Sequence, residues 1–230
     1  MKKIWNVINA ILMIAVFVGN YFYLTVGGIT IKSLCSSGFA LMGILNLVYA
    51  LLNKETNFRY HITMSVGLVL AMLGDILLHW SFVWGAGLFA LGHICFLVSY
   101  CLLIKPKRLD FIFGGAIFVA AGAFLLFFPL LDFSEPYKRW VCFVYALIIS
   151  MMLGKALSNV IRHPNDVTVT VAVGSVLFFF SDLMLVLDMF IGRWSWTGDA
   201  CMATYYPAEC LLALSIYVLS RMKEKERKKN

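Results

Sequence analysis

Charged side chains are scarce in this sequence, which contains 13% Asp, Glu, Lys and Arg against 62% hydrophobic residues. Its mean hydropathy is +0.87. A soluble domain of 230 residues has no core large enough to hide so much apolar surface. Composition therefore excludes an ordinary soluble globular fold and predicts a polytopic membrane protein.

Metal and redox motifs are also missing. No two of the six cysteines form a C-x-x-C pair, which argues against a zinc ribbon or a redox motif. We interpret these cysteines as small buried hydrophobic residues. The net charge of +7 does not indicate nucleic-acid binding, because the basic residues lie at the termini and between apolar runs. There they set membrane topology and contact anionic lipid headgroups.

Long apolar runs dominate the chain instead. Windows of roughly 18–25 apolar residues are long enough to cross a bilayer as helices. We place eight such windows at 4–24, 31–52, 62–80, 83–104, 111–131, 139–160, 168–190 and 201–220. The first has no convincing small-x-small cleavage site, so we expect it to remain as an uncleaved span. Residues 1–230 should form a single all-α transmembrane domain.

Basic residues predict the orientation of these helices. One set of loops and both termini carry most of them: Lys2, Lys3, Lys54, Arg59, Lys105, Lys107, Arg108, Arg162 and the tail from Arg221. The opposite side has only Lys32, Lys138, Arg139 and Arg193. The positive-inside rule then places both termini in the cytoplasm. We expect a multi-pass protein of the plasma membrane.

A weak internal repeat links the two halves of the chain. Gly74-Asp75 lies in the third window and Ser181-Asp182 in the seventh, each about two-thirds of the way along an outward-going helix. If helices 1–4 and 5–8 are parallel repeats, the two aspartates should meet at the interface between the repeats.

Asp75 and Asp182 are the strongest functional candidates, because an ionised Asp costs about 2.5–3.5 kcal/mol at the centre of a membrane helix. Further polar residues fall in the same outer layer, or at its edge: His93, Tyr145, Tyr206, Glu209, Lys32 and His79. Buried ionisable groups pair with one another or line a water-filled cavity, so we expect these side chains to converge. Two alternatives stay open, namely that Asp75 is a structural hydrogen-bond partner and that His79 only orients it.

Five short motifs follow one another at helix-length spacing over essentially the whole chain. They are Gly74-Asp75-x-x-Leu78, Gly92-His93, Tyr145, Gly174 followed by Phe178-Phe179-Phe180-Ser181-Asp182, and Tyr206-Pro-Ala-Glu209. In this order they resemble the YhhN-like lysoplasmalogenase family. The resemblance implies an integral membrane hydrolase that cleaves the vinyl-ether bond of lysoplasmalogens to a fatty aldehyde and a glycerophospho-ethanolamine or -choline.

The same resemblance assigns the family's acidic residues to Asp75 and Asp182. Two positions depart from the family pattern. Glu209 stands where Gln is common, and Lys32-Ser33 stands where Lys-Pro is common. The additional carboxyl group changes the local charge balance.

Vinyl-ether hydrolysis is proton chemistry and fits these residues without a cofactor or metal. A neutral carboxylic acid protonates the terminal vinyl carbon, water adds to the resulting oxocarbenium ion, and the hemiacetal collapses. A low-dielectric layer favours a neutral carboxyl group, and a nearby like charge drives two carboxyl groups into different protonation states. Paired carboxylates handle a similar transition state in glycosidases. We therefore hypothesise that Asp75 and Asp182 form an acid/base pair, with His93 relaying a proton or positioning water. Tyr145 and Tyr206 would donate hydrogen bonds, and together with Glu209, Lys32 and His79 they are our candidate contacts to a lysophospholipid substrate.

Three other functions remain compatible with the sequence. Buried Asp and His residues also mark proton-coupled transporters, although central proline interruptions are few here. A zinc-dependent lipid hydrolase would have to use His79, His93 and the aspartates, because His61 and His163 fall on the cytoplasmic side. A non-enzymatic lipid-binding protein would tolerate Asp75→Asn. The sequence predicts no oligomeric state.

Overall fold

The computed structural model describes residues 2–53, 58–192 and 194–228. These residues form eight helices: α1 (Lys2–Val26), α2 (Ile29–Leu52), α3 (Arg59–Leu77), α4 (Phe82–Leu103), α5 (Arg108–Phe127), α6 (Pro136–Arg162), α7 (Asp166–Ile191) and α8 (Trp196–Arg227). Each is long and apolar enough to span a membrane, which confirms the predicted all-α membrane bundle. Lys54 and Arg193, on which the topology prediction draws, lie outside the described residues.

Local chemistry fixes helix ends that hydropathy does not. The side chain of Asn165 caps the first turn of α7, and the helix stops at Gly192, whose φ of 62° favours glycine. α3 ends at Leu77, short of the predicted boundary at residue 80. α8 continues to Arg227, past the predicted boundary at residue 220, because its charged C-terminal segment stays helical beyond the apolar window.

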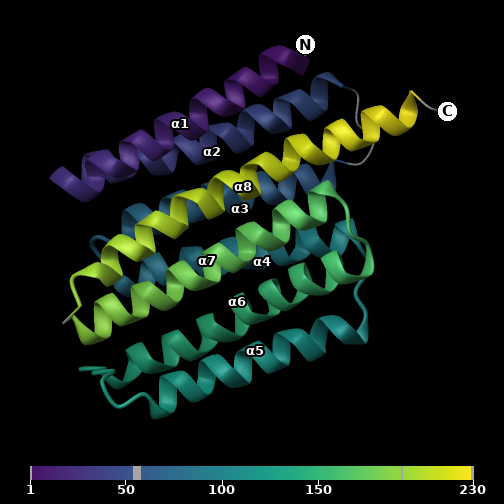
Figure 1. The fold of residues 1–230 in the computed structure, drawn as a ribbon. Coiled ribbons are helices and arrows are strands. Elements are labelled where there is room, and N and C mark those ends of the chain that lie inside the picture. The colour runs from purple at the N-terminus through teal and green to yellow at the C-terminus, as the bar shows by residue number, and fades with distance from the viewer. Residues whose placement is uncertain (1, 54–57, 193, 229–230) are drawn as a thin grey trace.

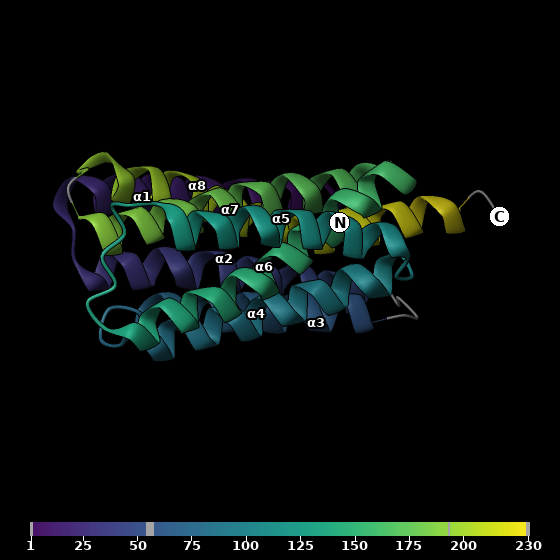
Figure 2. The same ribbon diagram turned by 90° about the horizontal axis from the view of Figure 1, so that it is seen from below.

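The helices lie nearly parallel or antiparallel to one another, and both termini lie at the same end of the bundle (Figure 1). An even number of spans requires this arrangement. The view turned by 90° shows α3 and α4 on one side of the bundle and α7 and α8 on the other (Figure 2). That the end with the termini faces the cytoplasm stays a prediction from the charge distribution.

Helix contacts in the first half recur in the second. The pairs α1–α2, α2–α3 and α3–α4 correspond to α5–α6, α6–α7 and α7–α8, and the contact of α2 with α8 corresponds to that of α6 with α4. This is the pattern expected of a 4+4 parallel repeat. The correspondence is weaker at two places. The backbone of α8 approaches those of α1 and α3 closely, whereas among the described helices the backbone of α4 approaches neither α5 nor α7 as closely, and α4 meets α7 through side chains such as His93 and Phe178.

Among the described helices the backbone of α5 comes close to that of α6 alone, and this contact is tightest near the end of the bundle that holds the termini. There the two backbones touch, since a Cβ added to Gly154 would lie 2.3 Å from the backbone nitrogen of Gly114. Beside this contact the buried Asp110 carboxylate lies 2.9 Å from Lys155 Nζ and 3.0 Å from an Arg162 guanidinium nitrogen. The other end of α5 is left free to border a cavity.

Candidate functional site

Asp75 lies on α3 in a polar cluster that also takes residues from α2 and α8. Its Oδ1 atom is 2.9 Å from Lys32 Nζ, and the Ser36 hydroxyl donates a hydrogen bond to Oδ2. The Tyr206 hydroxyl reaches the same Oδ2 at 3.5 Å and the Lys32 carbonyl at 3.3 Å. All four residues are buried, and we call this group the Lys32 cluster. Burying a charge requires a counter-ion and hydrogen-bond donors, and the Asp75 carboxylate has both.

Asp182 lies on α7 in a second cluster, with His93 from α4 and Tyr145 from α6. Tyr145 donates a hydrogen bond of 2.6 Å to Asp182 Oδ2. The Tyr145 oxygen lies 2.7 Å from His93 Nε2, which is itself 3.5 Å from Asp182 Oδ2. We call this group the His93 cluster. With Tyr145 donating to the carboxylate, His93 Nε2–H donates to the phenol oxygen, so a continuous path for proton transfer joins the imidazole to the carboxyl group.

Aromatic rings connect the two clusters. The rings of Tyr206 and Tyr205 have centroids 5.0 Å apart, Tyr205 and Phe178 are 5.5 Å apart, and Phe178 and His93 are 4.6 Å apart. Among the residues that the structure describes, the two aspartates do not hydrogen-bond each other, and each carboxylate takes its partners from its neighbouring helices. The acid/base pairing of Asp75 with Asp182 stays a prediction.

Glu209 and His79 form none of the expected hydrogen bonds with the other candidate residues that the structure describes. Glu209 is fully buried on α8, and neither of its carboxyl oxygens has a hydrogen-bond partner among the described residues. His79 lies beyond the end of α3, where it is exposed and its ring meets that of Trp80 at 5.4 Å. Because α3 stops at Leu77, His79 is not carried onto the helix face of Asp75, and it joins neither cluster.

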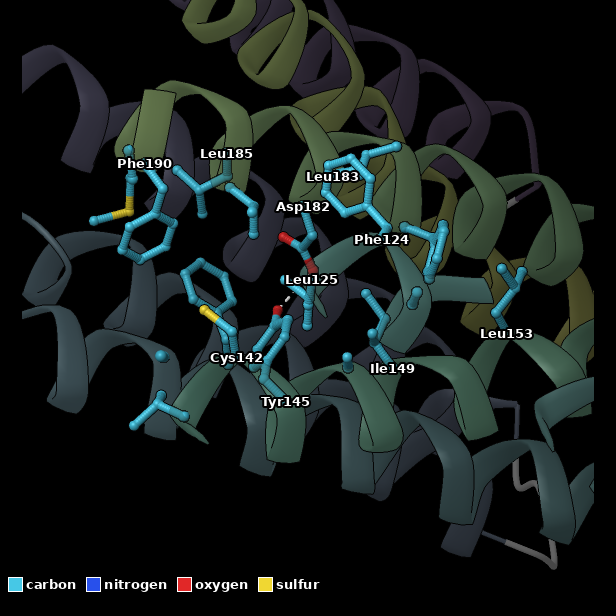
Figure 3. Close-up of a pocket in the computed structure, with 18 of the residues that line it drawn as sticks. Phe124, Leu125, Cys142, Tyr145, Ile149, Leu153, Asp182, Leu183, Leu185 and Phe190 are labelled. Atoms are coloured by element: carbon cyan, nitrogen blue, oxygen red, sulfur yellow. Dashed lines mark hydrogen bonds between the residues drawn. The ribbon is translucent and has the colours of Figure 1, made fainter. Parts of the chain in front are cut away.

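A cavity of about 490 Å³ lies between α4, α5, α6 and α7. Its walls are almost wholly apolar and include Phe89, Phe124, Ile149, Leu153, Leu157, Leu183 and Phe190. Asp182 and Tyr145 are the two lining residues, among those that the structure describes, with an oxygen-bearing side chain. Figure 3 shows them on facing helices, joined by their hydrogen bond at the cavity wall. Its volume lies within the range of about 300–1,000 Å³ typical of ligand pockets.

The candidate residues differ in whether they border the cavity. Asp182 and Tyr145 border it, whereas Lys32, Asp75, Tyr206 and Glu209 are not among its lining residues. An apolar cavity with one acidic group and one hydroxyl at its wall can bind a hydrocarbon chain and present a reactive bond to an acid. Among the described residues, no group of three or more His, Cys, Asp and Glu side chains is placed to hold a metal ion.

Sequence reasoning missed two contributors. Ser36, which hydrogen-bonds Asp75, lies four residues after Lys32 and therefore on the same helix face, so this spacing could have identified it. Tyr205 is buried between the aromatic rings of both clusters, and its hydroxyl has no hydrogen-bond partner among the described residues. Its sequence position beside Tyr206 carries no comparable signal.

Comparison with known proteins adds independent findings. The model of the YhhN family matches residues 35–216. The bovine protein named lysoplasmalogenase TMEM86A is 30% identical over 158 residues, covering 65% of this chain and 63% of its own length. Rat lysoplasmalogenase TMEM86B is 29% identical over 175 residues, or 75% and 69% of the two chains. A Mycobacterium bovis lysoplasmalogenase is 35% identical over 167 residues, or 65% and 58%. No solved structure matches significantly.

Proposed function

Because the chain belongs to the YhhN family, whose model matches most of its length, we propose that it is a membrane hydrolase that cleaves the vinyl-ether bond of lysoplasmalogens. The names of the bovine, rat and mycobacterial relatives support this activity. The observation that carries the proposal is the apolar cavity with Asp182 and Tyr145 at its wall. A single hydrocarbon chain fits the apolar walls, and the acid meets the bond to be cleaved.

In this proposal Asp182 is the catalytic acid. Its neutral carboxyl group gives a proton to the vinyl carbon remote from the ether oxygen, and the carbon bonded to that oxygen becomes an oxocarbenium ion. Water adds to this ion and returns a proton to the Asp182 carboxylate. The hemiacetal then breaks its bond to the glycerol oxygen, which receives the hydroxyl proton, and releases the fatty aldehyde. Water is the only co-reactant.

The His93 cluster supports this proton transfer. Tyr145, at 2.6 Å from Asp182, orients the carboxyl group and supplies a hydroxyl at the cavity wall. His93, at 2.7 Å from the Tyr145 oxygen, can pass a proton along the same path. A carboxyl group held in this way acts as acid in one step and as base in the next, as in retaining glycosidases.

The Lys32 cluster has a positioning role in the proposal. Lys32, Asp75 and Tyr206 fix α2, α3 and α8 behind the aromatic rings that contact His93. Glu209 is a buried carboxyl group that interacts electrostatically with both Asp75 and Asp182. We propose no substrate contact for it, since it does not line the cavity. We propose no substrate contact for the exposed His79.

We further propose that residues 1–230 act as one transmembrane domain in the plasma membrane and take a lysophospholipid from the surrounding bilayer. Its hydrocarbon tail would follow α6 from Tyr145 toward Leu153 and Leu157, which border the inner part of the cavity. Twelve residues separate Tyr145 from Leu157, which is about 18 Å along a helix. The glycerol and headgroup would then point toward the opposite end of the cavity.

Aldehyde release tests the proposal. Detergent-purified protein is incubated with a panel of lysoplasmalogens, and fatty aldehyde is measured by mass spectrometry. Asp182→Asn should lower the rate by about 10²–10⁴-fold, the usual contribution of a general acid. Asp199→Asn, at an exposed position in the first turn of α8, serves as the matched control.

This experiment tests the mechanism, the substrate and the transporter alternative separately. Undiminished aldehyde release from Asp182→Asn would refute the mechanism, and no release from any vinyl-ether lipid would refute the substrate. Proton-coupled flux of a solute across liposomes without product formation would favour a transporter.

A further inference from the structure

Arg139 stands out among the basic residues at the end of the bundle opposite to the termini. Three described residues there carry a positive charge: Lys32, Lys138 and Arg139. Lys32 is buried in an ion pair with Asp75. Lys138 lies 2.6 Å from Glu135. The hydrogen bond from Lys138 lowers the pKa of the Glu135 carboxyl group, so both groups are ionised at neutral pH. Their opposite charges then offset each other.

Arg139 has a different partner. Its guanidinium lies over the ring of Phe133, with Cζ 5.0 Å from the ring centroid. No carboxylate among the described residues forms an ion pair with it, and the side chain is exposed. A cation stacked on an aromatic ring keeps its N–H donors available for a planar or tetrahedral oxyanion.

Phe133 connects this guanidinium to the cavity. Its ring lies 4.5 Å from that of Phe190, which lines the cavity. The loop that carries Phe133 is held in place because the backbone N–H of Asp132 donates a hydrogen bond of 3.0 Å to the Phe190 carbonyl. Arg139 is therefore fixed at the outer rim of the cavity, over the loop between α5 and α6.

We propose that Arg139 binds the phosphate of the lysophospholipid headgroup at this rim and thereby sets the preference for phosphorylated substrates. The inference rests on the proposed function. Six residues on α6 separate Arg139 from Tyr145, which is about 9 Å along the helix. In the substrate, about six bonds separate the oxygen-bonded vinyl carbon from phosphorus. Two extended residues contain the same number of backbone bonds and span about 7 Å. The long arginine side chain covers the difference.

The test compares substrates with and without phosphate. Initial rates of aldehyde release are measured for 1-alkenyl-glycerophosphoethanolamine and for the phosphate-free 1-alkenyl-glycerol, in micelles of equal composition. Arg139→Gln should raise KM for the phospholipid about ten- to hundredfold, the range for losing a charge-assisted hydrogen bond. It should leave KM for the alkenyl-glycerol within about twofold, because the cavity is intact. Arg139→Lys should give an intermediate KM, since an ammonium retains the charge but not the bidentate donors.

Lys138→Gln is the matched control, because Lys138 is already neutralised by Glu135; it should change neither KM by more than about twofold. Equal effects of Arg139→Gln on both substrates, or no effect on either, would overturn the assignment.

A binding measurement keeps this test separate from the proposed activity. The saturated 1-alkyl-glycerophosphoethanolamine cannot be hydrolysed at a vinyl ether, and its binding is followed by thermal stabilisation of the purified protein. Weaker stabilisation of Arg139→Gln than of the wild type, with equal stabilisation of both by 1-alkyl-glycerol, supports phosphate binding even if no aldehyde forms. Equal stabilisation of both proteins by the phospholipid overturns it.

Discussion

Asp75 and Asp182 occupy equivalent positions in the two halves of the bundle. Each lies on the third helix of its half, α3 or α7. Each takes one set of partners from the second helix of its own half and another from the last helix of the other half. Lys32 and Ser36 on α2 thus correspond to Tyr145 on α6, and Tyr206 on α8 corresponds to His93 on α4.

The halves differ where the cavity lies. In the first half α1 packs against α8, but the corresponding helix α5 does not pack against α4. The space between α4, α5, α6 and α7 is left as the apolar cavity. Departure from the repeat therefore gives Asp182 access to a ligand, while Asp75 remains enclosed beside its counter-ion.

Tyr145→Phe tests the proton path in the His93 cluster. The change removes the hydroxyl that joins Asp182 to His93 and leaves the ring in place. We expect kcat for aldehyde release to fall by about tenfold or more with little change in KM, because a hydrogen bond to a charged group contributes about 1.5–3 kcal/mol. Tyr21→Phe, at an exposed position on α1, is the control. An unchanged kcat for Tyr145→Phe would remove the hydroxyl from the mechanism.

Lys32→Met tests the ion pair in the other cluster. It leaves the Asp75 carboxylate buried without its counter-ion, which typically destabilises a protein by about 3–5 kcal/mol. Replacing both partners, as Lys32→Met with Asp75→Leu, should recover a large part of the loss, since no buried charge remains. Thermal unfolding in detergent of both single variants and the double variant measures the coupling. Strictly additive losses would show that the ion pair contributes no coupling energy.

Gly154→Ala tests the contact between α5 and α6. Its added methyl group would lie 2.3 Å from Gly114 N, so the two helix backbones must separate. We expect a clear fall in the unfolding temperature, corresponding to about 1–3 kcal/mol for overpacking. Gly115→Ala is a matched control on the adjacent helix, because a Cβ there meets nothing within 4 Å. Similar stability of the two variants would contradict the close approach.

Leu157→Trp tests the direction of the hydrocarbon chain. The larger ring would fill the inner end of the cavity, which Leu157 lines. Substrates with long chains should lose kcat/KM while those with short chains keep it, because only the long chains reach this depth. Ile161→Trp, one turn further along α6 and 60% exposed, should not change the chain-length profile. A uniform loss for all chain lengths would reverse the proposed orientation or refute tail binding there.

Hydropathy was sufficient to predict the eight spans, because each must be apolar over the thickness of a bilayer. Helix ends depend on capping side chains, glycine and proline rather than on hydropathy, and the sequence predicts them less well. Hydropathy predicts that the fifth window reaches residue 131, but α5 ends at Phe127, two residues before Pro129. α8 runs to Arg227 because helix formation does not require lipid.

The candidate residues were found because ionisable groups are costly in a membrane, but their partners could not be predicted. The internal repeat and the acid/base chemistry predict that Asp75 and Asp182 act together, but they do not identify the partners of either carboxylate. The register of α2 decides instead that Lys32 and Ser36 meet Asp75. The early end of α3 removes His79 from the helix face of Asp75. The cavity depends on the absence of packing between α4 and α5, which no residue pattern marks.

The central place of α8 has a consequence for biosynthesis. This helix packs against α1, α2, α3 and α7, yet it is synthesised after all of them. Until then Asp75 lacks the Tyr206 hydroxyl, and the Asn46 side chain lacks the Ala213 carbonyl that it bonds at 3.0 Å. The contacts that join α1, α2 and α3 to α8 can therefore form only after all eight described helices have been synthesised.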